Sequence, residues 1–253
     1  MKHSNPLSTG PLTRGERAPL LELREVSLRY GAKTALNNVH LSLNSGQIVG
    51  LVGANGSGKT SLLRVLAGLE RNYSGSYTIA SQPFREEMAA EMVYLPDHIP
   101  FPDHYNVREI LRAYRDHFEN FDFLLASDMV ARYGLSPKLK LSQMSRGMKE
   151  KLMIAMSLSR RARIYLMDEP MGGVDVEALE EIVSGIIDSF REDSLLILST
   201  HLLRDLEPLI DRVVIMDEGQ ILLSESMEEL SQNYSGNLAE IYKEVLREKT
   251  LAD

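Results

Sequence analysis

The spacing of hydrophobic and polar residues predicts alternating strands and helices along most of the chain. Residues 21–30 (LELREVSLRY) alternate in polarity as a half-buried strand does, whereas residues 47–53 (QIVGLVG) form the continuous apolar run of a buried strand. Residues 61–69 carry apolar side chains at helical spacing. The same criteria predict further strands at 40–43, 77–79, 92–96, 164–170, 195–200 and 213–216, a hairpin turn at 218–219 and a helix near 176–190.

The pattern changes after residue 97, where helical spacing replaces strand-like runs up to about residue 158. Two helical patterns lie between residues 106 and 134, and Asn106 is suited to cap the first of them. That helix would present one apolar face, formed by Val107, Ile110, Leu111, Tyr114 and Phe118. We therefore interpret residues 97–158 as a helical subdomain inserted into an α/β core.

Both ends of the chain differ from its middle. Residues 1–19 are rich in Pro, Ser and Gly and lack an apolar stretch, so we expect a disordered tail and no secretory signal. One large domain is predicted over residues 20–230, followed by an amphipathic helix within 231–253. The apolar stripe of that helix is formed by Leu238, Ile241, Tyr242, Val245 and Leu246. Such a helix either packs on its own domain or docks a partner.

Composition narrows the class of protein. The chain has 253 residues, of which 43% are hydrophobic and 25% charged, as in ordinary globular proteins. A transmembrane helix is not expected, because no apolar run reaches 18 residues. The absence of cysteine excludes disulfides and thiolate metal sites, and the net charge of −8 argues against nucleic-acid binding. The cytosol is the simplest compartment.

Candidate chemistry begins with GANGSGKT at residues 53–60, which matches the phosphate-loop pattern G-x-x-x-x-G-K-[ST] in full. A strand precedes it and a helix follows, as a phosphate loop requires; a glycine-rich turn without a ligand is the alternative. Glycines let backbone N–H groups surround phosphate oxygens, and the helix N-terminus adds positive potential. Lys59 should reach the β and γ phosphates, and the Thr60 hydroxyl should bind Mg²⁺. The predicted ATP-binding residues of this segment are Gly53, Asn55, Gly56, Ser57, Gly58, Lys59, Thr60 and Ser61.

A pair of carboxylates, Asp168 and Glu169, ends the predicted strand that begins at residue 164. A carboxylate at the C-terminal end of a parallel strand beside a phosphate loop can hold Mg²⁺, usually through water. The next side chain points to the other side of the strand, so Glu169 can polarise a water aimed at the γ-phosphate. A solvated strand end is the alternative, which the phosphate loop in the same chain disfavours.

Taken in order, these segments resemble the ATP-binding subunits of ABC transporters, over roughly residues 21–230. The resemblance implies an α/β P-loop NTPase of the ABC ATPase type, with a mostly parallel sheet core, an N-terminal antiparallel β part and an inserted helical subdomain. It also implies ATP hydrolysis coupled to transport. The run 145–151 (SRGMKEK) and the loop MGGVD are most similar to bacterial exporter-type subunits.

The family carries a serine at a helix start, often in an LSGGQ pattern, a fixed distance before the Asp-Glu strand. Ser145 lies 23 residues before Asp168, which matches this spacing, whereas Ser142 lies 26 residues before it. The resemblance therefore implies that Ser145 and Gly147 contact the ATP of a second subunit in a head-to-tail dimer. Arg146 departs from the family's usual glycine. A plain helix cap is the alternative role for Ser145.

Four more positions carry roles that the resemblance implies. Tyr30 matches the aromatic residue that stacks on adenine, although a core tyrosine is the alternative. His201, in STHLLRD, matches a histidine that contacts the γ-phosphate, and a surface or capping role is the alternative. Asp175 matches the aspartate of the loop that links the two ATP sites, and it can also cap the next helix. Asp97 stands where the family usually has a glutamine that touches Mg²⁺, so its metal role is doubtful.

The resemblance implies three partners: Mg·ATP, a second ATPase subunit (identical or not) and a separate membrane-spanning permease, with the helical insertion as the docking surface. The subunit would then lie on the cytoplasmic face of the cell membrane and power export. Two alternatives stay open. ABC-type ATPases that act on DNA repair or ribosomes usually have two ATPase domains or a long coiled coil, and this chain shows one phosphate loop and no heptads. A GTPase would show an N-K-x-D motif, which is missing.

Overall fold

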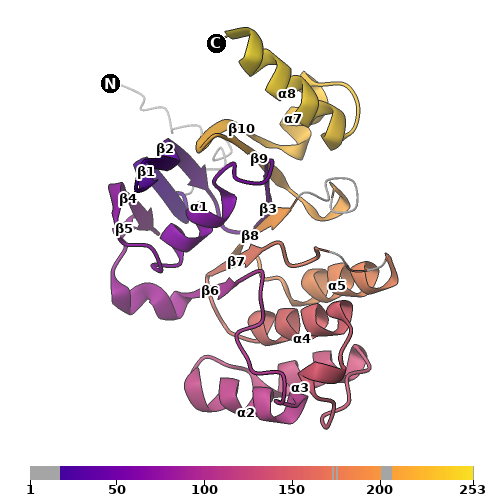
Figure 1. The fold of residues 1–253 in the computed structure, drawn as a ribbon. Coiled ribbons are helices and arrows are strands. Elements are labelled where there is room, and N and C mark those ends of the chain that lie inside the picture. The colour runs from indigo at the N-terminus through magenta and orange to yellow at the C-terminus, as the bar shows by residue number, and fades with distance from the viewer. Residues whose placement is uncertain (1–17, 173, 175, 201–206, 253) are drawn as a thin grey trace, which may run out of the picture.

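A computed structural model describes residues 18–172, 174, 176–200 and 207–252. Within these residues the strands form a four-stranded sheet, ordered β2-β1-β4-β5, and a six-stranded sheet, ordered β10-β9-β3-β8-β7-β6 (Figure 1). The small sheet is antiparallel, and the large one is parallel except for its edge pair β9–β10. The predicted fold class, an α/β core with an antiparallel N-terminal part, is confirmed.

The elements have the following bounds. The strands are β1 (Leu21–Tyr30), β2 (Lys33–Leu43), β3 (Gln47–Val52), β4 (Tyr73–Ile79), β5 (Gln82–Pro83), β6 (Met92–Leu95), β7 (Ile164–Asp168), β8 (Leu195–Thr200), β9 (Arg212–Asp217) and β10 (Gln220–Ser226). The α-helices are α1 (Lys59–Leu66), α2 (Val107–His117), α3 (Phe123–Arg132), α4 (Arg146–Leu158), α5 (Val176–Ser189), α7 (Met227–Asn233) and α8 (Leu238–Ala252). Short 3₁₀ helices lie at Glu86–Glu91, Leu141–Gln143 and Glu207–Leu209.

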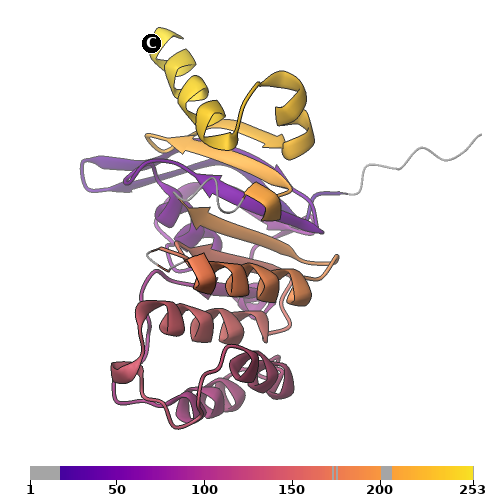
Figure 2. The same ribbon diagram turned by 90° about the vertical axis from the view of Figure 1, so that its right-hand side faces the viewer.

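Alternate residues of the central strands face two different cores. On β3, Val49 and Leu51 pack with α1 and the antiparallel sheet, whereas Ile48 and Val52 pack with α4 and α5. Strands β7 and β8 divide their side chains in the same way. Successive side chains of a strand point to opposite faces, so α1 covers one face of the six-stranded sheet and α4 with α5 covers the other. Figures 1 and 2 show this arrangement.

The predicted helical insertion lies between β6 and β7 and contains α2, α3 and α4 (Figure 2). Asn106 caps α2 with a reciprocal pair of hydrogen bonds: its side chain accepts from the Glu109 N–H at 3.0 Å, and the Glu109 carboxylate accepts from the Asn106 N–H at 2.8 Å. Asp122 caps α3 by accepting from the Leu125 N–H at 3.1 Å. Each of these two helices therefore starts where a polar side chain satisfies one of its free N–H groups.

Some predicted bounds were wrong at the edges. Strand β2 begins at Lys33, not residue 40, because its first half pairs with β1 through irregular register that breaks simple alternation. Helix α1 begins at Lys59 and ends at Leu66, before Gly68, whose φ of 70° is left-handed. The hairpin turn predicted at residues 218–219 is confirmed, since β9 and β10 pair on either side of it.

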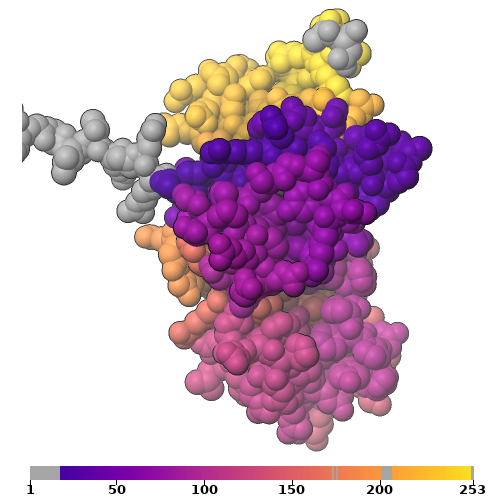
Figure 3. Space-filling view, turned by 90° about the vertical axis from the view of Figure 1, so that its left-hand side faces the viewer, coloured from indigo at the N-terminus to yellow at the C-terminus, as the bar shows by residue number. Residues whose placement is uncertain are grey.

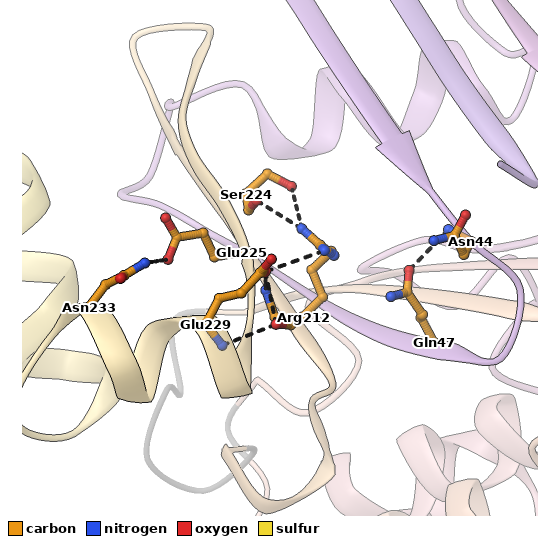
Figure 4. A network of polar contacts seen from close by, with 8 residues as sticks. Asn44, Gln47, Arg212, Ser224, Glu225, Glu229 and Asn233 are labelled. Carbon is orange, nitrogen blue, oxygen red and sulfur yellow. Dashed lines mark hydrogen bonds and ion pairs between the residues drawn. The ribbon is translucent and has the colours of Figure 1, made fainter. Parts of the chain in front are cut away.

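The C-terminal helices are attached to the edge of the large sheet. Arg212 of β9 donates to the Ser224 carbonyl at 2.8 Å and lies 3.6 Å from the Glu229 carboxylate of α7 (Figure 4). On α8, Leu238, Ile241 and Val245 are buried in the same core as α4 and α5. The amphipathic stripe therefore packs on its own chain. In Figure 3 the C-terminal segment, in yellow, lies above the indigo strands of the antiparallel sheet.

None of the helices within the described ranges is long and apolar enough to cross a membrane.

Candidate functional site

The predicted phosphate loop joins β3 to α1, and close packing requires two of its glycines, Gly53 and Gly58. A side chain at Gly53 would lie 2.4 Å from the Met216 carbonyl oxygen. Gly58, the residue before α1, has φ of 111°, and a side chain there would lie 2.7 Å from the Ala35 carbonyl oxygen. A larger residue at Gly53 or Gly58 would therefore force this loop away from β9 or β2.

Lys59 folds back over the loop that it follows. Its ammonium group donates to the Gly53 carbonyl at 2.7 Å and to the Ala54 carbonyl at 3.2 Å, and the side chain is only 6% exposed. Burial lowers the pKa of Lys59, and the Glu169 and Asp168 carboxylates act in the opposite direction. The loop thus holds one cation at the start of α1, where a phosphate group would be attracted.

Asp168 ends β7 and is almost completely buried. The register of parallel strands β7 and β8 places it beside Ser199, whose hydroxyl donates to the carboxylate at 2.7 Å. The Tyr94 hydroxyl of β6 lies 3.5 Å from the other carboxylate oxygen. Burial, with a contribution from Asp168, raises the pKa of Tyr94 far above its usual range, so the phenol keeps its proton.

Glu169, the next residue, has a different environment. Its backbone lies in the left-handed region, with φ of 48°, and its N–H donates to the Ser199 hydroxyl oxygen at 2.9 Å. Its carboxylate is 24% exposed and lies 3.9 Å from the Lys59 ammonium. Left-handed backbone at a non-glycine residue is uncommon and often marks a functional site. The structure therefore brings Lys59, Asp168 and Glu169 together, and their roles in hydrolysis stay predictions.

The other predicted loop residues divide into an exposed and a buried set. Asn55, Gly56 and Thr60 are exposed, whereas Ser57 is buried, and its hydroxyl has no hydrogen-bond partner among the described residues. The Ser57 N–H donates to the Ala54 carbonyl at 3.1 Å. Ser61 lies half-buried in the first turn of α1.

Tyr30 ends β1 and is 45% exposed, so it is not a core residue. Partial burial and the Glu70 carboxylate raise its pKa, and the Ser61 hydroxyl acts in the opposite direction. Tyr30 therefore lies on the surface beside the start of α1, where an adenine ring could reach it. The stacking role itself stays a prediction.

Ser145 is the N-cap of α4: its hydroxyl accepts from the Met148 N–H at 3.2 Å. It is exposed, as is Arg146, which pairs with Glu150 at 3.0 Å. Gly147 is half-buried against Val174 and Ala178. The capping role of Ser145 is thus confirmed, and a cap at an exposed helix start is compatible with a contact to phosphate.

For three of the predicted site residues, the structure gives no support for a role at the nucleotide. Asp97 is exposed, and its carboxylate lies 3.0 Å from the ring of the neighbouring His98. Asp175 and His201 lie outside the described residues.

A protein-only metal cage is not found, because no group of three or more His, Cys, Asp or Glu residues gathers in the described part of the chain. Mg²⁺ at a nucleotide needs only one or two protein ligands, with phosphates and waters completing its shell. Thr60 and Asp168 fit that number.

Comparison with known proteins decides the family. Residues 36–172, more than half of the chain, match the family described as ABC transporter. The chain belongs to the ABC transporter family. Its aligned relatives include the aliphatic sulfonates import ATP-binding protein SsuB of Pectobacterium atrosepticum, which is 30% identical over 97% of this chain and 91% of its own length. The lantibiotic transport ATP-binding protein SrtF of Streptococcus pyogenes is 28% identical over 85% and 96%.

The fold is shared with a solved structure. A solved structure titled as an ATP binding subunit of an ABC transporter superposes with a TM-score of 0.80 at 23% identity, over 90% of this chain and 99% of that one. The chain is thus the ATP-binding subunit of an ABC transporter, an ATPase coupled to transport.

Sequence reasoning missed the residues that support the two carboxylates. Ser199 was seen only as part of a strand, and Tyr94 only as an apolar strand residue. The strand order β8-β7-β6 places both beside Asp168. A sequence signal existed for Ser199, since a polar residue near the end of an apolar strand (LLILST) is unusual, but its partner depended on the register.

Proposed function

We propose that two copies of this ABC subunit close head to tail around two Mg·ATP and so power export through a separate permease. The observation that carries the proposal is the placement of α1 and α4 on opposite faces of the central sheet. The phosphate loop starts α1, and Ser145 starts α4. An exposed serine so placed is better suited to meet the nucleotide of a second copy than its own.

The chemistry follows from the site. Lys59 and the loop N–H groups bind the phosphates, and Thr60 with Asp168 would hold Mg²⁺, which would neutralise charge on the transferred phosphoryl group. Glu169 lies beside Lys59 on a backbone fixed by Ser199, and it would orient and deprotonate the attacking water. ATP supplies contacts that exist only in the closed pair, so it favours closure, and hydrolysis removes them.

The test uses Glu169→Gln, with Glu119→Gln as the control at an exposed position. We expect Glu169→Gln to stop nearly all hydrolysis and to form a stable dimer with Mg·ATP, measured by light scattering after size exclusion. The control should hydrolyse ATP at the unchanged rate. A Glu169→Gln protein that stays monomeric with Mg·ATP and hydrolyses normally would rule out this mechanism.

The proposal also includes the direction of transport, which is export. The resemblance of residues 145–151 to exporter-type subunits and the lantibiotic-transport relative favour export, whereas the sulfonate relative is an importer. A strain that lacks the gene for this subunit distinguishes export from import. Increased sensitivity to a lantibiotic peptide supports export, and loss of growth on an alkanesulfonate as sole sulfur source supports import.

The permease contact is assigned to the helical insertion, residues 97–158, with the subunit on the cytoplasmic face of the membrane. The support is position: α2 and α3 project away from the sheets in Figures 1 and 2. Crosslinking from Leu124, which is 80% exposed on α3, to a co-expressed permease tests this contact. Crosslinks found only from α8 would contradict it.

A further inference from the structure

Helix α8 contacts the turn that supports the phosphate loop. The Lys249 ammonium donates to the Asp217 carboxylate at 2.8 Å and to the Glu218 carboxylate at 2.8 Å. Asp217 ends β9, and Glu218 begins the turn to β10. One side chain near the end of α8 thus holds both acidic residues of this hairpin.

The turn itself is fixed to the phosphate loop. Glu218 and Gly219 both have left-handed backbone, with φ of 46° and 81°, as a tight two-residue hairpin turn needs. The Gly219 N–H donates to the Ser57 carbonyl at 2.9 Å, and the Gly219 carbonyl accepts from the Asn37 N–H at 2.9 Å. Because a side chain at Gly219 would lie 2.8 Å from the Ala35 carbonyl, the turn has little room to move.

A second contact from α8 reaches the loop directly. The Tyr242 hydroxyl lies close enough to the backbone of Ala54, the second residue of the loop, for that backbone to affect its pKa. Burial and the Asp217 carboxylate raise the pKa of Tyr242, whereas the Ala54 backbone acts in the opposite direction. Tyr242 is half-buried and packs against the main core. Tyr242 therefore lies beside the phosphate loop itself, whereas Lys249 acts on the loop through the turn at Glu218.

Helix α8 does not depend on these contacts for its position. Leu238, Ile241 and Val245 anchor it in the core that α4 and α5 share. Removal of one hydroxyl or one ammonium group should therefore leave the helix in place and change only the loop. An effect on the stability of the fold can therefore be separated from an effect on nucleotide affinity.

We propose that Tyr242 and Lys249 are positioning residues that hold the phosphate loop in the shape that binds nucleotide, so that α8 sets the affinity for ATP and ADP. The loop contains three glycines, and a flexible loop loses conformational entropy when a nucleotide orders it. Contacts that order the loop beforehand reduce this loss. The inference requires nucleotide binding by the loop, and it holds whether or not two copies close head to tail.

The experiment measures ADP affinity at equilibrium, because ADP binding needs neither hydrolysis nor a second copy. The variants are Tyr242→Phe, Lys249→Met and Lys249→Arg, and the control is Lys243→Met, at an exposed position of the same helix. We expect Tyr242→Phe and Lys249→Met each to weaken ADP binding about threefold to tenfold, the effect of one modest hydrogen bond. Melting temperatures without nucleotide should stay within a few degrees of the parent, and Lys249→Arg should restore most of the affinity.

Two outcomes would overturn the proposal. The first is unchanged ADP affinity in both Tyr242→Phe and Lys249→Met. The second is equal weakening in Lys243→Met, which would show a general effect of α8. A failed dimerisation of Glu169→Gln with intact effects at Tyr242 and Lys249 would reject the head-to-tail mechanism and keep the positioning role.

Discussion

The Lys59 ammonium lies 3.9 Å from the Glu169 carboxylate, although 109 residues separate the two along the chain. The same ammonium contacts two carbonyl oxygens of the phosphate loop. The pair joins the group that would bind phosphate to the group that would direct water. Because these two groups are close together, the phosphate loop and the carboxylates at the end of β7 form one site.

Lys59→Met should weaken nucleotide binding while preserving the fold. Methionine has nearly the length of lysine and suits a side chain that is only 6% exposed. Hydrogen bonds to charged groups contribute about 1.5–3 kcal/mol, so the ADP dissociation constant should rise about tenfold to hundredfold. Equilibrium binding of ADP checks this, with Lys138→Met at an exposed loop position as the control. Equal affinity in parent and Lys59→Met would show that the loop binds phosphate without this cation.

Ser199→Ala should slow hydrolysis more than it weakens ATP binding. The Ser199 hydroxyl donates to Asp168 and accepts from the Glu169 N–H, so its loss leaves a buried carboxylate oxygen and a backbone N–H without this partner. An unsatisfied buried group costs about 1–3 kcal/mol, and both carboxylates would shift. We expect kcat to fall about tenfold or more and KM to change less.

The matched control is Ser194→Ala, which removes another buried serine hydroxyl, bonded to the Arg191 carbonyl at 2.7 Å and remote from the carboxylates. Both variants should lower the melting temperature. If Ser194→Ala reduced kcat as strongly as Ser199→Ala, the effect would come from lost stability and not from the site.

Ser145→Asn separates the capping role of Ser145 from a contact to phosphate. Asparagine caps helices about as well as serine, so α4 should keep its stability. The longer amide would displace a phosphate that approaches the helix start. In a Glu169→Gln background we expect the Mg·ATP-dependent dimer to disappear, measured by light scattering, while the melting temperature stays close to the parent. Ser142→Asn, at an exposed position three residues earlier, should still form the dimer; loss of the dimer in both would point to a general disturbance of this loop.

Sequence reasoning succeeded where the signal was local. The phosphate loop is one contiguous segment between a strand and a helix, and the carboxylates end one apolar strand, so each pattern is complete within a few residues. The N-caps Asn106 and Ser145 are local for the same reason, because a cap bonds to an N–H three residues on.

The remaining contacts depend on the tertiary fold. Ser199 meets Asp168 only because β7 and β8 pair in one register, and a shift by one residue would point Ser199 to the other face. Lys249 reaches Asp217, and Tyr242 reaches Ala54, only after α8 has packed on the core. No spacing in the sequence encodes such distances.

Glu150 should make stability depend on pH in an unusual direction. Its carboxylate pairs with Arg146 through one oxygen, whereas the other oxygen is buried without a hydrogen-bond partner among the described residues. Burial raises the pKa of Glu150, and the Arg146 guanidinium lowers it by less. Because the folded state takes up this proton more readily than the unfolded state, the contribution of Glu150 to stability is largest at low pH. It decreases as pH rises through the pKa of the folded state.

The measurement compares the unfolding free energy of the parent and Glu150→Gln by urea denaturation between about pH 4 and about pH 7. Glutamine is uncharged throughout, so the parent should lose stability relative to Glu150→Gln as pH rises. Glu180→Gln, at an exposed position on α5, should show no such trend. A difference between parent and Glu150→Gln that grows in favour of the parent towards neutral pH would mean that Arg146 outweighs burial. The pair would then stabilise α4 as an ordinary surface salt bridge does.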